Sequence, residues 1–419
     1  MNRFTTFASL STAVLASVGS IDAMAQESSL VTRGEQSSWV FRGSVTVRSV
    51  TDTRVGQDEI ATSDRWSLGT VAMVFPLITQ TSSAEVRSRA VDSTFTLNNS
   101  VVDERPTFMN SFPVGAQFGR WDFVSPEGKQ LRSGYARLQL EYNVTSYDTI
   151  YDDEAAEQLD WPDEWPEIAQ SSFEPMPFVD YEPGRGEYDM EPVERLIKRW
   201  TRGRDPKALK PAVLAKFLAG QVVQHVQPSG DGFAFDRTGI IEGIRVPPVV
   251  ASRRRGSPVD MAVLLLAVYR EAGLPARLVL GIDAEDGERD GEFLEQGGGP
   301  PALRAWVEFA LVDPRTRAIA WVPVDPVAIR KSSSRMPREY WTKPIEFFGS
   351  HDELDGVVPF SFHLFPPTTV RSYGGSGSPG FWGWFVTPTP PERAHQTLDL
   401  SVHSQVVRGG QQNQPRRRR

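Results

Sequence analysis

Apolar and polar residues alternate with a period of two along much of the first third of the chain, which is typical of strands with one buried face. The clearest run is 136–144, where Ala, Leu, Leu, Tyr and Val alternate with Arg, Gln, Glu and Asn. Segments 39–50, 66–75 and 91–97 are rich in Val, Thr, Phe and Trp, and most are separated by Gly, Asn or Pro. We therefore expect residues 26–150 to form an antiparallel, sandwich-like β domain.

Residues 151–190 lose this alternation and form an acidic, proline-rich connector. It contains Trp161 and Trp165, each followed by proline. Exposed tryptophans are uncommon, so we expect both rings to pack on neighbouring structure. Stacking on a carbohydrate is the alternative interpretation.

Helical periodicity begins at Glu191. Asp205 and Pro206 resemble a helix start, and apolar residues over 213–223 then follow an i, i+3, i+4 stripe. We therefore expect one helix from Glu191 and another that starts at Asp205 and continues over 213–223.

A further helix is predicted from Ser257, with Pro258 at its first position and Asp260 at the third, an arrangement close to a capping box. Residues 261–269 are apolar on every side, so this helix should be buried. Gly273 has the character of a residue that ends a helix.

Strands are predicted after this helix. They cover 277–282, 303–311 and 320–324, and weaker patterns lie at 357–365 and 397–407.

Composition adds limits to this outline. The chain has 419 residues, 39% of them hydrophobic, which is enough for two or more domains with their own cores. Its formal net charge is −8, and the basic end 408–419 makes the remainder still more acidic. An acidic body argues against nucleic-acid binding, and we expect the basic end to be a disordered tail.

The N-terminus has the pattern of a secretory signal over residues 1–25. Arg3 precedes an apolar stretch, and Ala23-Met24-Ala25 predicts cleavage before Gln26. A membrane anchor is the weaker alternative because Ser and Thr interrupt a stretch that is short for a bilayer. The chain has no cysteine, which fits an oxidising compartment. We expect a periplasmic or secreted protein of the bacterial cell envelope, with no transmembrane segment after signal removal.

Four short motifs together resemble those of the transglutaminase-like superfamily, roughly G-x-C-x-D-x-A, G-[IL]-P-A-R, H-A-W-V-E and W-V-P-x-D-P. In this chain they read as G-S-P-V-D-M-A at 256–262, G-L-P-A-R at 273–277, R-A-W-V-E at 304–308 and W-V-P-V-D-P at 321–326. The resemblance implies an α+β, papain-like core over residues 191–345, with a buried central helix packed on an antiparallel sheet. Residues 346–407 would then be a C-terminal extension.

The resemblance also places the family's Cys-His-Asp triad. The cysteine falls on Pro258, the histidine on Arg304, and the aspartate is kept as Asp325. Proline has no nucleophile, and arginine stays protonated and cannot act as a base. Ser257 is better explained as the helix N-cap than as a substitute nucleophile. The resemblance thus implies the fold and argues against the reaction, so we expect no catalytic residues and no enzyme activity.

Arg304 and Asp325 should lie near each other and near the N-terminus of the helix that begins at Pro258. Our preferred interpretation is an ion pair that fills the former cleft. The alternative is an anion site, in which Arg304 and free backbone N–H groups hold a ligand carboxylate. The binding candidates are therefore Arg304, Asp325, Ser257 and Trp306, although Trp306 is also expected to pack in the core.

One acidic loop is a weak calcium candidate. Its carboxylates are Asp283, Glu285, Asp286, Glu288 and Asp290. The loop lacks the spacing of an EF-hand, and a solvated acidic loop is favoured. No spacing suggests zinc, and we expect no metal and no cofactor.

Two functions remain open. The preferred one is an exported, catalytically inactive transglutaminase-like protein that binds or scaffolds a peptide or protein in the inherited cleft. The alternative is a hydrolase or acyltransferase that uses a site other than the family's triad.

Overall fold

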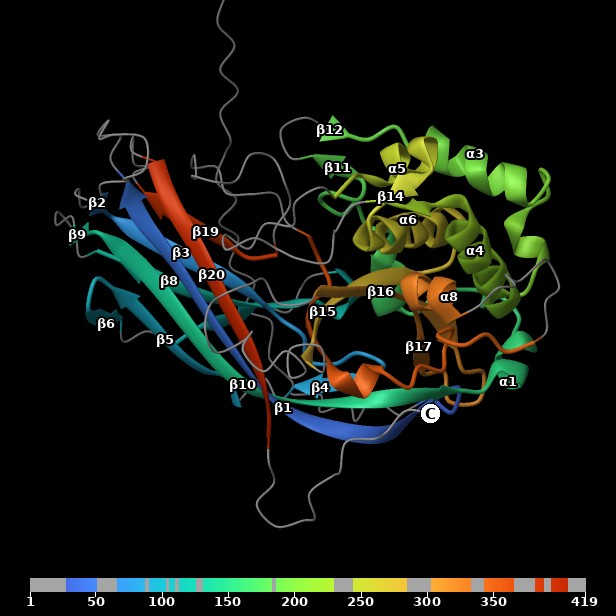
Figure 1. The fold of residues 1–419 in the computed structure, drawn as a ribbon, viewed down its shortest axis with the longest axis horizontal. Helices are drawn as coiled ribbons and strands as arrows, with labels where there is room; N and C mark the ends of the chain where they lie inside the picture. The colour runs from blue at the N-terminus through green and yellow to red at the C-terminus, as the bar shows by residue number, and fades with distance from the viewer. Residues whose placement is uncertain are drawn as a thin grey trace, which may run out of the picture.

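The computed structural model describes residues 28–50, 66–86, 90–102, 105–109, 113–125, 131–182, 186–229, 244–284, 303–332, 343–364, 381–387 and 393–405. The predicted signal, 1–25, and the basic end, 408–419, lie outside these residues. Figure 1 shows long β-strands across the left and bottom of the molecule and a helical region at the upper right.

The largest sheet is built on two long antiparallel strands, β1 (Val31–Val50) and β10 (Tyr135–Tyr151). Its described strands run in the order β20-β1-β10-β5-β6, and β4 also pairs with β10. Side chains of β10 alternate between buried and accessible over 136–144, as the sequence predicted. The other members are β4 (Ala84–Val86), β5 (Asp92–Leu97), β6 (Ser100–Val102) and β20 (Arg393–Ser404).

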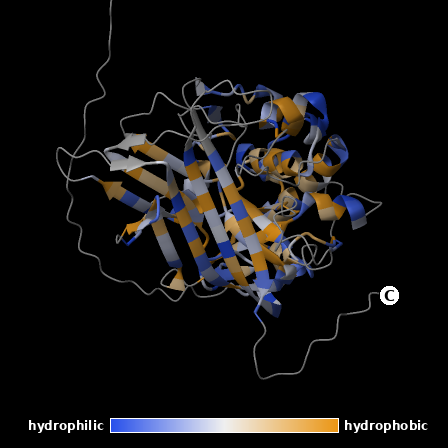
Figure 2. Ribbon diagram, turned by 60° about the vertical axis from the view of Figure 1, so that its left-hand side comes forward, coloured by the Kyte–Doolittle hydropathy of each residue, from blue (hydrophilic) through white to orange (hydrophobic). Residues whose placement is uncertain are grey.

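A second antiparallel sheet packs on this one, in the order β19-β3-β8-β7. Phe41 of the first sheet contacts Phe75 of the second, with ring centroids 6.3 Å apart. Figure 2 shows hydrophobic and hydrophilic bands alternating along the long strands. The second sheet consists of β3 (Thr70–Leu77), β7 (Thr107–Met109), β8 (Gln117–Val124) and β19 (Gly383–Thr387). Strands β2 (Trp66–Leu68) and β9 (Leu131–Ser133) form a separate two-stranded sheet.

The last part of the chain does not form one body. The sequence grouped residues 346–407 as a C-terminal extension, whereas their strands join three different sheets. β18 (Val357–Ser361) pairs with the core strand β15, β19 pairs with β3, and β20 pairs with β1. Pairing satisfies backbone groups that an edge strand would leave open.

The core sheet is antiparallel, in the order β17-β16-β15-β18. Its other strands are β15 (Ala276–Asp283), β16 (Leu303–Val312) and β17 (Ile319–Val324), close to the predicted bounds. Helix α6 (Pro258–Glu271) packs on it and is buried through residue 269. The α+β class and the buried central helix are confirmed.

The start of α6 has the predicted capping box. The Asp260 backbone N–H donates to Ser257 Oγ over 3.1 Å, and the Ser257 N–H donates to Asp260 Oδ2 over 2.8 Å. Gly273 follows the helix with φ +84°, a conformation that favours glycine.

The predicted helix start at Asp205 differs in detail. Asp205 caps only one 3-10 turn, η4 (Pro206–Ala208), and α4 (Pro211–His225) begins afterwards. Proline disfavours the helical conformation in the residue that precedes it, and Lys210, which precedes Pro211, is extended at φ −65°, ψ 149°. Pro211 therefore separates the two elements.

The remaining elements surround this core. The helices are α1 (Asp153–Glu157), α2 (Glu167–Gln170), α3 (Glu191–Trp200), α5 (Pro247–Arg253) and α8 (Pro326–Ser332); the 3-10 turns are η2 (Pro113–Gly115), η3 (Ser171–Phe173) and η5 (Leu354–Gly356); the short strand pairs are β11 (Tyr181–Glu182) with β12 (Gly186–Glu187), and β13 (Gln227–Pro228) with β14 (Arg255–Gly256). None of the described helices has the length and apolar character needed to cross a membrane.

The two connector tryptophans pack as expected. Trp161 and Trp165 meet edge to face with centroids 6.2 Å apart, and Trp161 Nε1 donates to the Leu209 carbonyl over 2.8 Å. These contacts favour packing over a carbohydrate platform.

Candidate functional site

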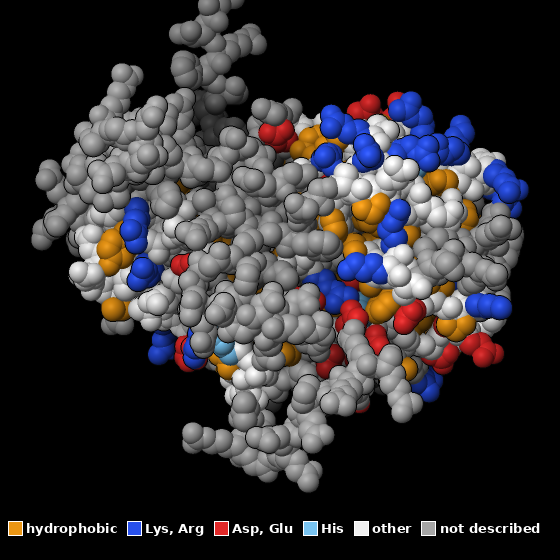
Figure 3. Space-filling view, in the orientation of Figure 1, with side chains coloured by type: hydrophobic (Ala, Val, Ile, Leu, Met, Phe, Trp, Pro, Cys, Tyr) orange, Lys and Arg blue, Asp and Glu red, His pale blue; other side chains and the backbone are white. Residues whose placement is uncertain are grey.

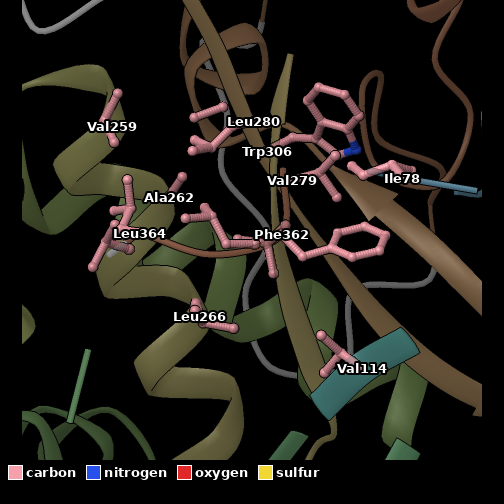
Figure 4. Packing of buried hydrophobic residues seen from close by; sticks show 14 of the residues in the cluster. Ile78, Val114, Val259, Ala262, Leu266, Val279, Leu280, Trp306, Phe362 and Leu364 are labelled. Carbon is pink, nitrogen blue, oxygen red and sulfur yellow. The ribbon is translucent and has the colours of Figure 1, made fainter. Parts of the chain in front are cut away.

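The two faces of the core sheet have different neighbours. Tyr269 of α6 packs on Phe309 of β16, with centroids 5.6 Å apart, so the face that carries Phe309 looks toward the helix. Successive strand residues point to opposite faces, which places Arg304, Trp306 and Glu308 on the other one. Figure 4 shows Trp306 directed away from α6, on the side of Ile78.

The N-terminal β domain covers that second face. Glu308 Oε1 accepts from the Ser82 backbone N–H over 3.0 Å. Thr149 of β10 exchanges backbone hydrogen bonds of 3.1 and 3.0 Å with His351. The core sheet is thus enclosed between α6 and the β domain (Figure 1). The alternation along β16 places Arg304 on the face toward the β domain.

Arg304 lies at the centre of a charged cluster and is 13% exposed. Its Nε donates to Asp325 Oδ2 over 3.1 Å, its Nη2 to Glu353 Oε2 over 2.9 Å and its Nη1 to Asp283 Oδ2 over 3.4 Å. Burial opposes the charge of Arg304, but the three carboxylates outweigh it and raise the pKa of the guanidinium. The predicted pair of Arg304 with Asp325 is confirmed, and it is part of a larger network.

His351 is the residue of this cluster that sequence reasoning missed. Its side chain is fully buried, and its Nδ1 accepts from the Glu353 backbone N–H over 3.3 Å. The proton of a neutral ring is then on Nε2, which lies 3.5 Å from Asp325 Oδ2. Both ring nitrogens are therefore engaged. No motif spacing pointed to His351, because it reaches the site from the loop that precedes β18, outside the quoted motifs.

Asp325 is held on two sides. Besides its ion pair, its Oδ1 accepts from the backbone N–H groups of Val327 and Ala328, each over 2.9 Å, at the start of α8. Burial alone would raise the pKa of this carboxyl, but the hydrogen bond from His351 and the charge of Arg304 hold it well below its usual range. Asp325 is thus fixed as a carboxylate.

The start of α6 does not share polar contacts with this cluster. Within the described chain, no hydrogen bond or ion pair joins Arg304 or Asp325 to α6 or to its N-cap. Ser257 is 3% exposed and occupied in the capping box. Its partner Asp260 is bound by Arg245, and burial raises the pKa of that carboxyl. The predicted approach of Arg304 and Asp325 to this helix end therefore stays a prediction.

A second buried ion pair joins Arg277 to Glu308, whose side chains are 4% and 0% exposed. The guanidinium lies between the rings of Trp321 and Phe362, 4.2 and 4.3 Å from their centroids. Its Nη1 donates to the Val114 carbonyl of the β domain over 3.0 Å. This pair was not singled out in the sequence, although both residues end a motif quoted above, G-L-P-A-R and R-A-W-V-E.

Comparison with known proteins gives one family. The model of the transglutaminase-like superfamily matches residues 214–326. Residues 214–326 are a transglutaminase-like domain. The match contains Pro258, Arg304 and Asp325, the positions at which the motifs place the triad. No curated protein matches the chain.

Solved structures of low identity resemble the chain. A candidate cysteine protease from Cytophaga hutchinsonii is 12% identical, with a TM-score of 0.47, over 90% of this chain and 93% of its own. A TGase is 13% identical, with a TM-score of 0.23, over 64% and 54% of the two chains. A candidate protease from Parabacteroides distasonis is 10% identical, with a TM-score of 0.22, over 76% and 73%.

The other site candidates of the transglutaminase-like domain are placed as follows. Trp306 is fully buried and packs in the core. Asp283 of the candidate calcium loop pairs with Arg304, whereas Glu285, Asp286, Glu288 and Asp290 lie outside the described residues. Within the part of the chain that the structure describes, no cluster of His, Asp and Glu has the arrangement of a metal site.

Proposed function

We propose that the transglutaminase-like domain is a non-catalytic module of an exported protein. The observation that carries this proposal is the network of Arg304, which stands at the family's histidine position and binds three carboxylates. A guanidinium so paired remains charged and cannot accept a proton.

The nucleophile position supports the same proposal. The family's thiolate is replaced by Pro258, and the chain contains no cysteine elsewhere. Proline supplies neither a nucleophile nor a backbone N–H for an oxyanion. Ser257 beside it is buried and already accepts the Asp260 N–H, so its hydroxyl is committed to the helix cap.

The proposed role is to bind or scaffold a peptide or protein chain. Its support is the resemblance to the superfamily, whose active members act on such chains. Export is proposed from the signal pattern at 1–25 and from the lack of cysteine, which suits an oxidising envelope compartment. Cross-linking of the mature protein in its own cells, followed by identification of the attached chains, would reveal such a partner. Recovery of no protein or peptide would contradict the binding role.

Activity assays on the purified mature protein test the proposal that the transglutaminase-like domain is non-catalytic. We expect no transamidation, amide hydrolysis or peptide hydrolysis on generic substrates, and no effect of thiol reagents. Turnover that is lost in Ser257→Ala but kept in the control Ser252→Ala would overturn the proposal, because Ser252 is an exposed serine on the preceding helix.

The alternative is an enzyme with a different site, and one observation favours it. His351 and Asp325 form a His–Asp pair next to the position that the family's histidine would occupy. Against it, His351 is fully buried and both of its nitrogens are engaged. The distinguishing variant is His351→Gln: if the wild-type protein shows turnover and this variant does not, the enzyme is the correct choice.

A further inference from the structure

A groove of about 680 Å³ lies between helices α3 and α5, away from the inherited site. The charged side chains that line it are all basic: Arg195, Lys198, Arg199, Arg202 and Arg254. Figure 3 shows Lys and Arg side chains gathered at the upper right of the molecule, over α3. The concentration of cations contrasts with the formal charge of −8 for the whole chain.

Most of these cations have no counter-charge. Arg195 lies 3.7 Å from Glu191. In the described part of the chain, no carboxylate lies within ion-pair distance of Lys198, Arg199, Arg202 or Arg254. A groove of this kind has a strongly positive potential that attracts anions.

A buried histidine positions one of the arginines. His225 is 5% exposed, and its Nε2 donates to the Ala251 carbonyl over 2.8 Å. Its Nδ1 is therefore the acceptor, and it lies 3.5 Å from Arg199 Nη2. Burial, together with the charges of Arg254 and Arg199, lowers the pKa of His225, so the ring stays neutral. Arg199 is thus held over the groove without loss of its charge.

Helix ends explain only part of the cluster. Cations near the C-termini of α3 and α5 compensate the partial negative charge there. That charge is about half an elementary charge per helix, far less than the five cations that line the groove. Moreover, Arg202 and Arg254 have φ of 55° and 58°, where glycine would be less strained. The backbone conformation therefore does not explain the choice of arginine at these two positions.

We propose that this groove binds a compact ligand that carries two or more phosphate groups. Guanidinium groups bind phosphate with paired hydrogen bonds, and a phosphate monoester carries about −1.5 to −2 charges, so two or three would neutralise the groove. The volume fits a small molecule. The exposed large hydrophobic side chains of the described residues lie elsewhere, so the groove has no apolar wedge for insertion into a bilayer. The ligand is either soluble or a phospholipid headgroup bound without insertion. This inference is independent of the proposed function.

The test is isothermal titration of the full mature protein with inorganic tripolyphosphate in about 0.15 M salt. We expect the wild type to bind. In the double variant Arg199→Gln with Arg254→Gln we expect the affinity to fall at least about tenfold, because the loss of one hydrogen bond to a charged group already lowers an affinity by about that factor. The matched control is Arg42→Gln with Arg120→Gln, which removes the same charge from exposed sites on β1 and β8. Its affinity should equal that of the wild type.

Two further arms separate the ligand sources. Binding to cardiolipin vesicles that tripolyphosphate displaces would assign the site to a headgroup with two phosphates, whereas binding of tripolyphosphate alone would assign it to a soluble phosphate. Three outcomes would overturn the proposal: no binding of either probe, an equal loss in the control variant, or tighter binding of a hexaglutamate peptide than of tripolyphosphate.

Discussion

A single arginine changes the chemistry of the inherited site. Where an active member of the family has a histidine that exchanges protons, Arg304 provides a permanent positive charge. Asp283, Asp325 and Glu353 surround the guanidinium, and Glu353 and Asp283 come from outside the triad. Under the proposed function, this network stabilises the fold and transfers no protons.

Removal of this arginine should be costly. We expect Arg304→Ala to lower the free energy of unfolding by about 3–5 kcal/mol at pH 7, since it leaves a buried Asp325 without its cation. The difference between the two proteins should shrink as the pH falls below 3.8, the unfolded value for Asp325, because its depressed pKa contributes stability only while the carboxyl is ionised.

Denaturant titration measures this effect, with Arg42→Ala as the control. Arg42 and Glu141 are 56% and 49% exposed, so their pair should contribute less than about 1 kcal/mol. Equal midpoints for Arg304→Ala and wild type would mean that the network contributes nothing to stability.

At the scale of elements, helix α6 follows local signals closely. A serine cap, a proline at the first position and an aspartate at the third all favour a start at Pro258, and the structure has that start. The packing of the helix does not depend on an amphipathic pattern, because it is buried on every side. Its register against the sheet is set by contacts such as Tyr269 with Phe309.

The cap of α6 gives the prediction at this scale. Ser257→Ala removes the acceptor for the Asp260 N–H and should destabilise the protein by about 1 kcal/mol. Thermal unfolding of Ser257→Ala and of Ser252→Ala measures it, and the second, an exposed site, should change stability by less than about 0.5 kcal/mol. The cap would have no energetic role if the two variants unfolded alike.

At the scale of the whole molecule, the β domain and the transglutaminase-like domain are joined by buried polar contacts. Glu308 binds Arg277 within the core sheet and Ser82 in the β domain. Arg277 in turn binds the Val114 carbonyl. Strand β20, near the end of the chain, returns to pair with β1, which ties the beginning of the fold to its end.

This junction predicts coupled unfolding. Glu308→Ala leaves Arg277 buried without its carboxylate and removes the acceptor for Ser82, so we expect a loss of about 3–5 kcal/mol. Hydrogen exchange should report faster exchange both in β16 and around Ser82, whereas the exposed control Glu141→Ala should change neither. Faster exchange confined to β16 would show that the two domains are not coupled through Glu308.

The sequence by itself determined the local elements. Period-two alternation identified the strands of the β domain, and the motifs at 256–262, 273–277, 304–308 and 321–326 identified the core. Only the tertiary structure decided what these residues contact. The resemblance to the superfamily's triad implied the pairing of Arg304 with Asp325, but the sequence contained no information on Glu353 and His351, which arrive on a later loop.

The same distinction applies to the face of the sheet and to the end of the chain. Strand alternation places Arg304 and Trp306 on the same face of the sheet. Only the packing of α6 and the β domain decides which of the two covers that face. Strand patterns near residues 357 and 397 indicated that strands exist, but pairing partners depend on contacts between residues far apart in the chain. Such contacts follow from burial and hydrogen bonding in the folded whole, which no local pattern encodes.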